Sequence, residues 1–262
     1  MSETHDDNWD KHWDRYAGSA SRNPAQAMRH KLIAQLLRRD DGPKRLFDIG
    51  SGQGDMLAKL RPQFPNAEFL GAELSASGVE ISKRKVPGAT FLVADLFSPP
   101  AEIERFQGWA TDAVCSEVLE HVDDPTAFLR AARPYLAADA RLIVTVPGGP
   151  MSAFDRHIGH RQHFSKKSLS KVLTDSGFIV HRVLRAGFPF FNLYRGVVIS
   201  RGERLASEVQ EGSSSFLADA AMAAFGVLFN FNLTDSPFGW QMIAVASKSS
   251  AERWHTRRAN DV

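Results

Sequence analysis

Acidic side chains close three successive apolar segments of the sequence. They are Asp48, Glu73 and Asp95, and glycine occupies every second position of 50–54, just after the first of them. Glycine lets a ligand approach the backbone closely, and the start of a following helix offers free N–H groups. A carboxylate in front of these glycines would repel a pyrophosphate and attract an ammonium group.

The second and third carboxylates extend the description of the ligand. Glu73 can accept hydrogen bonds from both hydroxyls of a ribose, and Asp95 can reach the exocyclic amine of an adenine. A ligand with an amino-acid head, an unphosphorylated ribose and an adenine is S-adenosylmethionine. The glycine spacing G-x-G-x-G also differs from the dinucleotide pattern G-x-G-x-x-G, which disfavours a nicotinamide-dependent dehydrogenase.

A second group of residues has the chemistry of a reaction centre. Glu117, Glu120 and His121 are spaced i, i+3 and i+4, so a helical turn would place them on one side. A later segment, 155–165, contains three histidines with His160 in the middle. Because imidazole titrates near neutrality, we interpret His121 and His160 as candidate general bases. We favour this interpretation without a metal; a divalent cation, if one is used, would have Glu117, Glu120, His121 and His160 as its ligands.

Alternating strand and helix segments position these residues. Periodicity predicts strands at 45–49, 67–74, 89–96, 111–118, 141–147, 178–186 and 240–248. It predicts helices at 55–64, 75–86, 123–136 and 165–177. Because parallel strands need helical crossovers, we expect an α/β fold with a doubly wound, Rossmann-like, mostly parallel seven-stranded sheet. A helical and aromatic insertion precedes the last strand.

The segments "DIGSGQG", "AEL" and "ADLF", in this order and spacing, resemble the class I S-adenosylmethionine-dependent methyltransferases. The resemblance covers about residues 45–185. It implies that the cofactor contacts a set of residues at the strand ends, with the methionine moiety at the glycine loop, the ribose at Glu73 and the adenine near Asp95. These residues are Asp48, Gly50, Ser51, Gly52, Gly54, Glu73, Leu74, Asp95, Leu96 and Glu117.

The pattern E-x-x-E-H with a later histidine is also similar to metal-assisted O-methyltransferases, among them ubiquinone-pathway catechol enzymes and enzymes of small-RNA 3′ ends. Related methyltransferases carry the same segments and use no metal. The resemblance therefore leaves the metal open, as the residues do.

Residue composition and the predicted elements divide the chain into five parts. In 1–40, Trp9, Trp13 and Tyr16 would share one helical face. The resemblance implies that such an N-terminal helical segment forms a lid over the cofactor, and we expect 1–40 to be that lid. The methyltransferase core is 41–187, and 239–248 is its last strand. The others are the insertion, 188–238, and a tail that we expect to be flexible, 249–262.

The insertion, 188–238, is dense in aromatic and aliphatic residues and must be buried against a partner. We rank a cap over a hydrophobic substrate first, a homodimer contact second and a membrane surface third. Arg195, Arg201 and Arg204 could bind an acidic group of the acceptor.

The composition of the chain limits the classes of binding partner and the cellular location that we expect. The chain has 262 residues, a formal net charge of +2 and 24% charged residues, with no long basic stripe for nucleic acid. Cys115 is the only cysteine, so an intrachain disulfide is excluded. The acidic N-terminal stretch does not look like a signal peptide, and no run of eighteen apolar residues occurs. We therefore expect a cytoplasmic protein with no transmembrane segment.

These observations favour a methyltransferase that transfers a methyl group to a small molecule, with a hydroxyl oxygen as the expected acceptor. Alternatives are an N-methyltransferase acting on an amine, an RNA 2′-O-methyltransferase, and a non-catalytic cofactor-binding interaction protein. The RNA enzyme would need a basic, stacking-rich groove, for which the sequence offers little.

Overall fold

The computed structural model describes residues 10, 23–38, 42–210 and 216–249, and of 202–210 and 216–219 it describes the backbone alone. Trp9, Trp13 and Tyr16 lie outside the described residues, as does the segment 250–262. The predicted lid helix and flexible tail therefore stay predictions.

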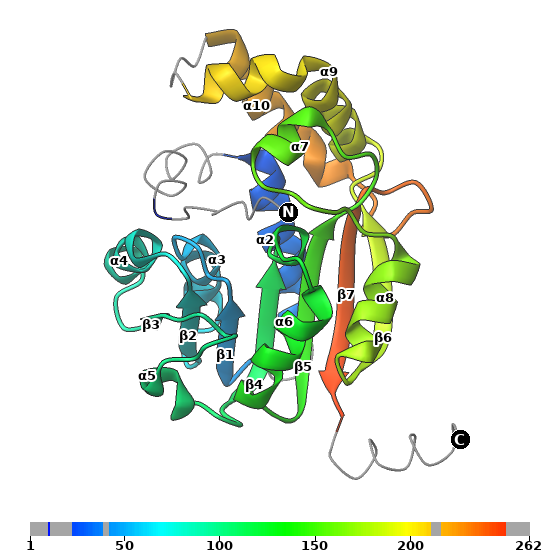
Figure 1. Ribbon diagram of the computed structural model, residues 1–262. Helices are drawn as coiled ribbons and strands as arrows, with labels where there is room; N and C mark the ends of the chain where they lie inside the picture. Colours follow the sequence, from blue (N-terminus) through cyan, green and yellow to red (C-terminus); the bar gives the residue numbers. More distant parts are fainter. Residues whose placement is uncertain (1–9, 11–22, 39–41, 211–215, 250–262) are drawn as a thin grey trace, which may run out of the picture.

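A seven-stranded sheet forms the centre of the molecule, in the order β3-β2-β1-β4-β5-β7-β6 (Figure 1). Its strands are β1 Arg45–Ile49, β2 Glu68–Glu73, β3 Thr90–Val93, β4 Ala110–Ser116, β5 Leu136–Pro147, β6 Phe178–Ala186 and β7 Gln241–Lys248. The first five pair in parallel, whereas β7 runs antiparallel to both β5 and β6. The predicted mostly parallel, Rossmann-like fold is confirmed.

The described helices lie between successive strands, except the first, which precedes β1. They are α2 Pro24–Leu37, α3 Asp55–Leu60, α4 Ala76–Lys85, α5 Ala101–Glu104, α6 Pro125–Ala132, α7 Ala153–His157, α8 Lys166–Asp175, α9 Phe190–Gln210 and α10 Phe216–Leu228. Single 3₁₀ turns are η1 Arg61–Gln63, η2 Leu119–His121, η3 Arg133–Tyr135 and η4 Phe229–Phe231. The starts of α4 and α6 are set by the caps Ser75 and Asp124, which accept hydrogen bonds from Gly78 N and Ala127 N.

Two apolar cores lie on opposite faces of the sheet. Along β1, Leu46 belongs to one core, while Phe47 and Ile49 belong to the other, as the two-residue repeat of a strand requires. The β1 residues from Leu46 to Ile49 are all buried. Burial on both faces explains why this strand reads as a continuous apolar run that only Asp48 interrupts.

The insertion folds as two helices, α9 and α10, with η4. Phe191 and Phe229 are buried with Ala25 and Met28 of α2, and they form a third, smaller core. An isolated antiparallel bridge between Phe188 and Leu233 closes the base of the insertion. In Figure 1, α7, α9 and α10 lie beyond the carboxyl ends of β4 and β5, where the strand arrows have their heads. The glycine loop that follows β1 lies at the same edge of the sheet.

Large apolar side chains remain exposed on the insertion: Leu193, Val197, Val227, Phe231, Leu233 and Phe238. Among the described helices, none combines the length and apolar character that a membrane span requires.

Candidate active site

The glycine loop between β1 and α3 adopts left-handed backbone, with φ of 73° at Gly50, 54° at Gly52 and 78° at Gly54. A Cβ on Gly50 would lie 2.6 Å from Val118 Cγ2, a distance that real Cβ atoms essentially never show. Glycine is therefore required here both for conformation and for space. Ser51, in the same loop, is buried.

Asp48 lies inside the sheet directly before this loop. Its side chain is buried, and its Oδ2 has no hydrogen-bond partner among the described residues. Burial and the negative charge of Glu73 raise the pKa of Asp48 to about 7. An ammonium group placed beside Asp48 would offset both effects, because it would pair with the carboxylate and donate to the open oxygen.

Glu73, the last residue of β2, joins the glycine loop to the start of α4. Its Oε2 accepts a hydrogen bond from Gly52 N at 2.8 Å, and its Oε1 accepts one from Ser75 N at 3.0 Å. The side chain is buried. These two bonds fix the orientation of the carboxylate at the end of β2, where the ribose is predicted to bind.

The predicted adenine-binding residues differ in accessibility. Asp95 lies two residues beyond the end of β3, is exposed, and accepts a hydrogen bond from Phe97 N at 2.9 Å. Leu96 is buried in the main core, whereas Leu74 is 51% exposed. Of the two leucines, Leu74 is therefore the one whose side chain is open to a purine.

Glu117 does not lie on a helical turn with Glu120 and His121, and that expectation is wrong. Its φ is 56°, a left-handed value that side-chain-bearing residues rarely adopt, and only 119–121 form a 3₁₀ turn. The backbone turns away here because Glu117 N still donates to Thr145 O at 2.9 Å, which extends the pairing of β4 with β5.

The Glu117 carboxylate faces a separate polar group. Its Oε1 accepts hydrogen bonds from Thr145 Oγ1 at 3.1 Å and Gln241 Nε2 at 2.9 Å. Its Oε2 lies 3.5 Å from Arg29 Nη1 of α2. Thr145 and Gln241 are fully buried. Glu117 thus belongs to a polar group at the ends of β4, β5 and β7. Its predicted contact with the cofactor stays a prediction.

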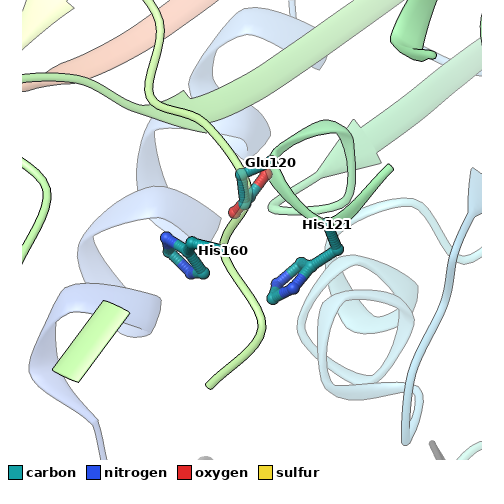
Figure 2. Close-up of side chains that lie close together, drawn as sticks. All are labelled: Glu120, His121 and His160. Carbon is teal, nitrogen blue, oxygen red and sulfur yellow. The ribbon is translucent and has the colours of Figure 1, made fainter. Parts of the chain in front are cut away.

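Three of the four candidate metal ligands converge. Glu120, His121 and His160 each offer a ligand atom, and these atoms lie within 4.8 Å of one another. Figure 2 shows Glu120 and His121 coming from one chain segment and His160 from another. The imidazole rings of His121 and His160 meet edge to face, with centroids 4.8 Å apart. Glu117 is not part of this cluster.

Glu120 has an unusual environment for a carboxyl group. Its exposed fraction is 0%, and neither side-chain oxygen has a hydrogen-bond partner among the described residues. Burial and the charge of Glu117 raise the pKa of Glu120 well above its usual value. A buried carboxyl group without partners must be protonated or must be matched by a cation or donor from a ligand.

His160 continues the cluster toward α7. Its Nδ1 lies 3.2 Å from His163 Nε2 and 3.9 Å from Asp155 Oδ1. Burial and the charge of His121 lower the pKa of His160 to about 2, and burial also lowers the pKa of His163. Both rings are therefore neutral at physiological pH. His157, the third histidine of this segment, is exposed on α7.

Sequence reasoning did not single out Asp155, Thr145, Gln241 or Arg29. Asp155 gave a weak signal, because Ser152 and Asp155 have the spacing of a capping box at the start of α7. The expectation that Arg195 binds an acidic acceptor is not supported, because its guanidinium forms two hydrogen bonds to Asp155, at 2.9 and 2.7 Å.

Residues 20–183 match the family described as "Methyltransferase domain". The chain belongs to this methyltransferase family. The match covers the glycine loop, Glu73, Asp95 and the Glu120–His121–His160 cluster, and it confirms the resemblance to class I S-adenosylmethionine-dependent methyltransferases.

Curated relatives of this methyltransferase carry several names. The chain is 28% identical over 138 residues to malonyl-[acyl-carrier protein] O-methyltransferase of Halalkalibacterium halodurans, covering 50% of each protein. It is 31% identical over 133 residues to demethylmenaquinone methyltransferase of Thermus thermophilus, covering 48% of this chain and 58% of the relative. The chain thus spans about half the length of the curated relatives it matches.

Solved structures show the same fold over most of the chain. A methyltransferase of Thermotoga maritima has a TM-score of 0.58 at 16% identity, covering 92% of this chain and 100% of its own. Geranyl diphosphate C-methyltransferase of Streptomyces coelicolor has a TM-score of 0.52 at 16% identity, covering 84% and 79%. At this level of identity the likeness shows the fold alone.

Proposed function

We propose that the chain is an S-adenosylmethionine-dependent methyltransferase that methylates a hydroxyl oxygen of a small molecule. The observation that carries the proposal is the Glu120–His121–His160 cluster, in which Glu120 and His121 follow β4 and His160 follows β5. Val118, two residues before Glu120, lies beside Gly50 of the glycine loop. Similar structures hold S-adenosylmethionine or S-adenosylhomocysteine, which supports this cofactor.

Transfer to oxygen has a simple electron balance. The acceptor oxygen attacks the methyl carbon of the sulfonium, the carbon–sulfur bond breaks with its electron pair left on sulfur, and the hydroxyl proton must leave. The imidazoles of His121 and His160 are the proposed acceptors of this proton, and an ionised Glu120 carboxylate beside them would stabilise the imidazolium that results. Alignment of the acceptor with the methyl group supplies the rest of the rate enhancement.

A divalent cation is a second possibility that one observation favours. Both oxygens of Glu120 are buried and have no hydrogen bond from any described residue, and they lie next to two imidazole nitrogens. This donor set fits a transition metal such as Zn²⁺ or Mn²⁺. Glu120, His121 and His160 would hold the ion. A bound cation supplies Lewis acidity, which lowers the pKa of an acceptor hydroxyl.

The insertion is proposed to act as a cap over a hydrophobic acceptor. Its helices α9 and α10 lie beyond the strand ends that carry the site (Figure 1), and its apolar residues exceed what its own small core buries. The printed names of the relatives include an acyl-carrier-linked acid, a quinone precursor and trans-aconitate, so acceptors differ among similar proteins.

The test of the proposed function uses methyl-labelled S-adenosylmethionine and two matched panels of apolar compounds, one of phenols and alcohols and one of amines. We expect label transfer to the hydroxyl panel. With the best acceptor, His160→Ala should lower kcat about 100-fold or more while the affinity for S-adenosylhomocysteine changes little. Transfer to amines alone would contradict the choice of oxygen.

The cation is tested separately, without a turnover assay. The wild-type protein is melted with and without Mn²⁺ or Zn²⁺, beside Glu120→Gln and the exposed control Glu68→Gln. A rise in Tm that Glu120→Gln abolishes and Glu68→Gln retains would support the site. Equal shifts in all three proteins, or unchanged methyl transfer after exhaustive chelation, would exclude a role for the cation.

A further inference from the structure

The insertion reaches the histidine cluster through one buried ion pair. Asp155 of α7 has an exposed fraction of 0%, and Arg195 of α9 binds both of its oxygens, with Nη1–Oδ1 at 2.9 Å and Nη2–Oδ2 at 2.7 Å. The Arg195 side chain is itself only 12% exposed. Two parallel hydrogen bonds between planar groups fix the orientation of both partners.

The same carboxylate is held from its other side by its own helix start. Asp155 Oδ2 accepts hydrogen bonds from Ser152 N at 2.7 Å and from Ser152 Oγ at 2.8 Å. With Arg195, Oδ2 therefore has three donors within hydrogen-bond distance. With these donors the carboxylate needs no further hydrogen bond from neighbouring side chains.

Two imidazoles lie next to this carboxylate: His160, which belongs to the Glu120–His121–His160 cluster, and His163. Asp155 Oδ1 lies 3.9 Å from His160 Nδ1, and Oδ2 lies 3.9 Å from His163 Nε2. Both distances exceed a hydrogen bond, so the rings bond to each other instead, at 3.2 Å. His160 N also donates to the backbone oxygen of Asp155 at 2.9 Å, so the two residues share one rigid turn.

Removing the guanidinium would change this balance. A buried carboxylate that loses its cation takes hydrogen bonds from the nearest donors, and here these are the rings of His160 and His163. Rotation of His160 toward Asp155 would break its edge-to-face contact with His121 and turn it away from Glu120. Asp155, His160 and His163 also form a group that could hold a cation, but Arg195 already supplies the positive charge there.

We propose that Arg195 is a positioning residue: it binds Asp155 and thereby keeps the imidazole of His160 in its cluster with Glu120 and His121, with the ring of His163 bonded to it. The insertion is then part of the reaction centre as well as a cap. This inference rests on the proposed function, in which the cluster serves the acceptor.

The experiment reads the histidine rings directly, with no acceptor required. Long-range ¹H–¹⁵N spectra of ¹⁵N-histidine-labelled protein report the tautomer of each imidazole, and His→Gln variants assign the signals. We compare wild type, Arg195→Gln, Arg195→Lys, the double variant Asp155→Asn/Arg195→Gln, and the exposed control Arg182→Gln. Binding of S-adenosylhomocysteine is measured on each protein by calorimetry.

In Arg195→Gln we expect the ring signals of His160 and His163 to shift or exchange between tautomers, while cofactor affinity stays within about twofold of wild type. The double variant should restore the wild-type pattern in large part, because no unpaired carboxylate remains. Arg195→Lys keeps the charge without the bidentate geometry and should give an intermediate pattern.

A merely structural role gives a different result. If Arg195→Gln lowers Tm but leaves the ring signals as unchanged as Arg182→Gln does, the proposal is overturned. If Arg195→Gln does not fold, the double variant and Arg195→Lys decide. Wild-type ring signals in Arg195→Lys together with disturbed ring signals in the double variant would also overturn the proposal. If the wild-type protein does not bind S-adenosylhomocysteine in the calorimeter, the proposed function is contradicted instead.

Discussion

Asp48 shows how one buried residue connects stability with ligand binding. Its carboxyl group has a pKa of about 7 in the folded chain because burial and the charge of Glu73 oppose ionisation. In an unfolded chain the pKa of an aspartate is near 4. The folded, ligand-free protein therefore holds a proton on Asp48 over a pH range in which the unfolded chain has lost it.

This difference predicts the sign of a pH effect. The contribution of Asp48 to stability is fully present below about pH 4 and is lost as the pH rises to about 7, by up to roughly 1.4 kcal/mol per pH unit. Asp48→Asn cannot ionise and lacks this loss. Urea titrations at pH 5 and pH 8 should therefore show the variant gaining stability relative to wild type at the higher pH. A constant difference between the two proteins would contradict the buried, raised-pKa description.

The loop that joins β1 to α3 is the element on which the cofactor site depends. Gly50 has φ of 73° with Val118 against it, whereas Gly108 has φ of 66° and open space where a Cβ would be. Gly108→Ala should cost about 1–2 kcal/mol, from backbone conformation alone. Gly50→Ala adds a steric clash, so we expect a larger loss of stability and loss of S-adenosylhomocysteine binding. Equal effects of the two substitutions in melting and calorimetry would show that the contact with Val118 is unimportant.

The sequence predicts these elements well where one physical signal dominates. Buried parallel strands give continuous apolar runs, and Ser75 and Asp124 mark helix starts through side-chain caps. The spacing of Glu117, Glu120 and His121 suggested that one helical turn could group them, but side-chain spacing says nothing about backbone pairing, which holds Glu117 N on Thr145 O. Asp155 and Arg195 are 40 residues apart and meet only through the packing of α7 on α9, so no local pattern reveals their pairing.

The whole molecule combines a sheet with two large cores and an insertion that has its own small aromatic core. Phe229 is the centre of that small core, with ring centroids 6.0 Å from Phe191, 5.7 Å from Tyr194 and 5.8 Å from Phe225. Outside the insertion, the buried members of the small core, Ala25 and Met28, come from α2, and Trp240 packs against them from the edge of β7. Because no buried residue of the sheet belongs to this core, we expect it to respond to mutation separately from the sheet.

Phe229→Ala tests this separation. The substitution should cost about 3–5 kcal/mol locally and should increase hydrogen exchange in α2 and in 190–201 while β1, β4 and β5 exchange as before. Phe238, which is 61% exposed, supplies the matched control, and Phe238→Ala should leave exchange unchanged throughout. Faster exchange across the sheet in Phe229→Ala would show instead that the insertion and the sheet form one cooperative unit.

Across the whole molecule, cofactor selection depends on carboxylates at strand ends that favour a zwitterionic nucleoside without phosphate. Calorimetric titration of S-adenosylhomocysteine into the wild-type protein, folded Glu73→Gln and the exposed control Glu68→Gln tests this most directly. We predict binding to wild type and to the control, a loss of about tenfold or more in Glu73→Gln, and no binding of NAD to any of them. Equal affinity of Glu73→Gln and wild type, or preference for NAD, would contradict the account.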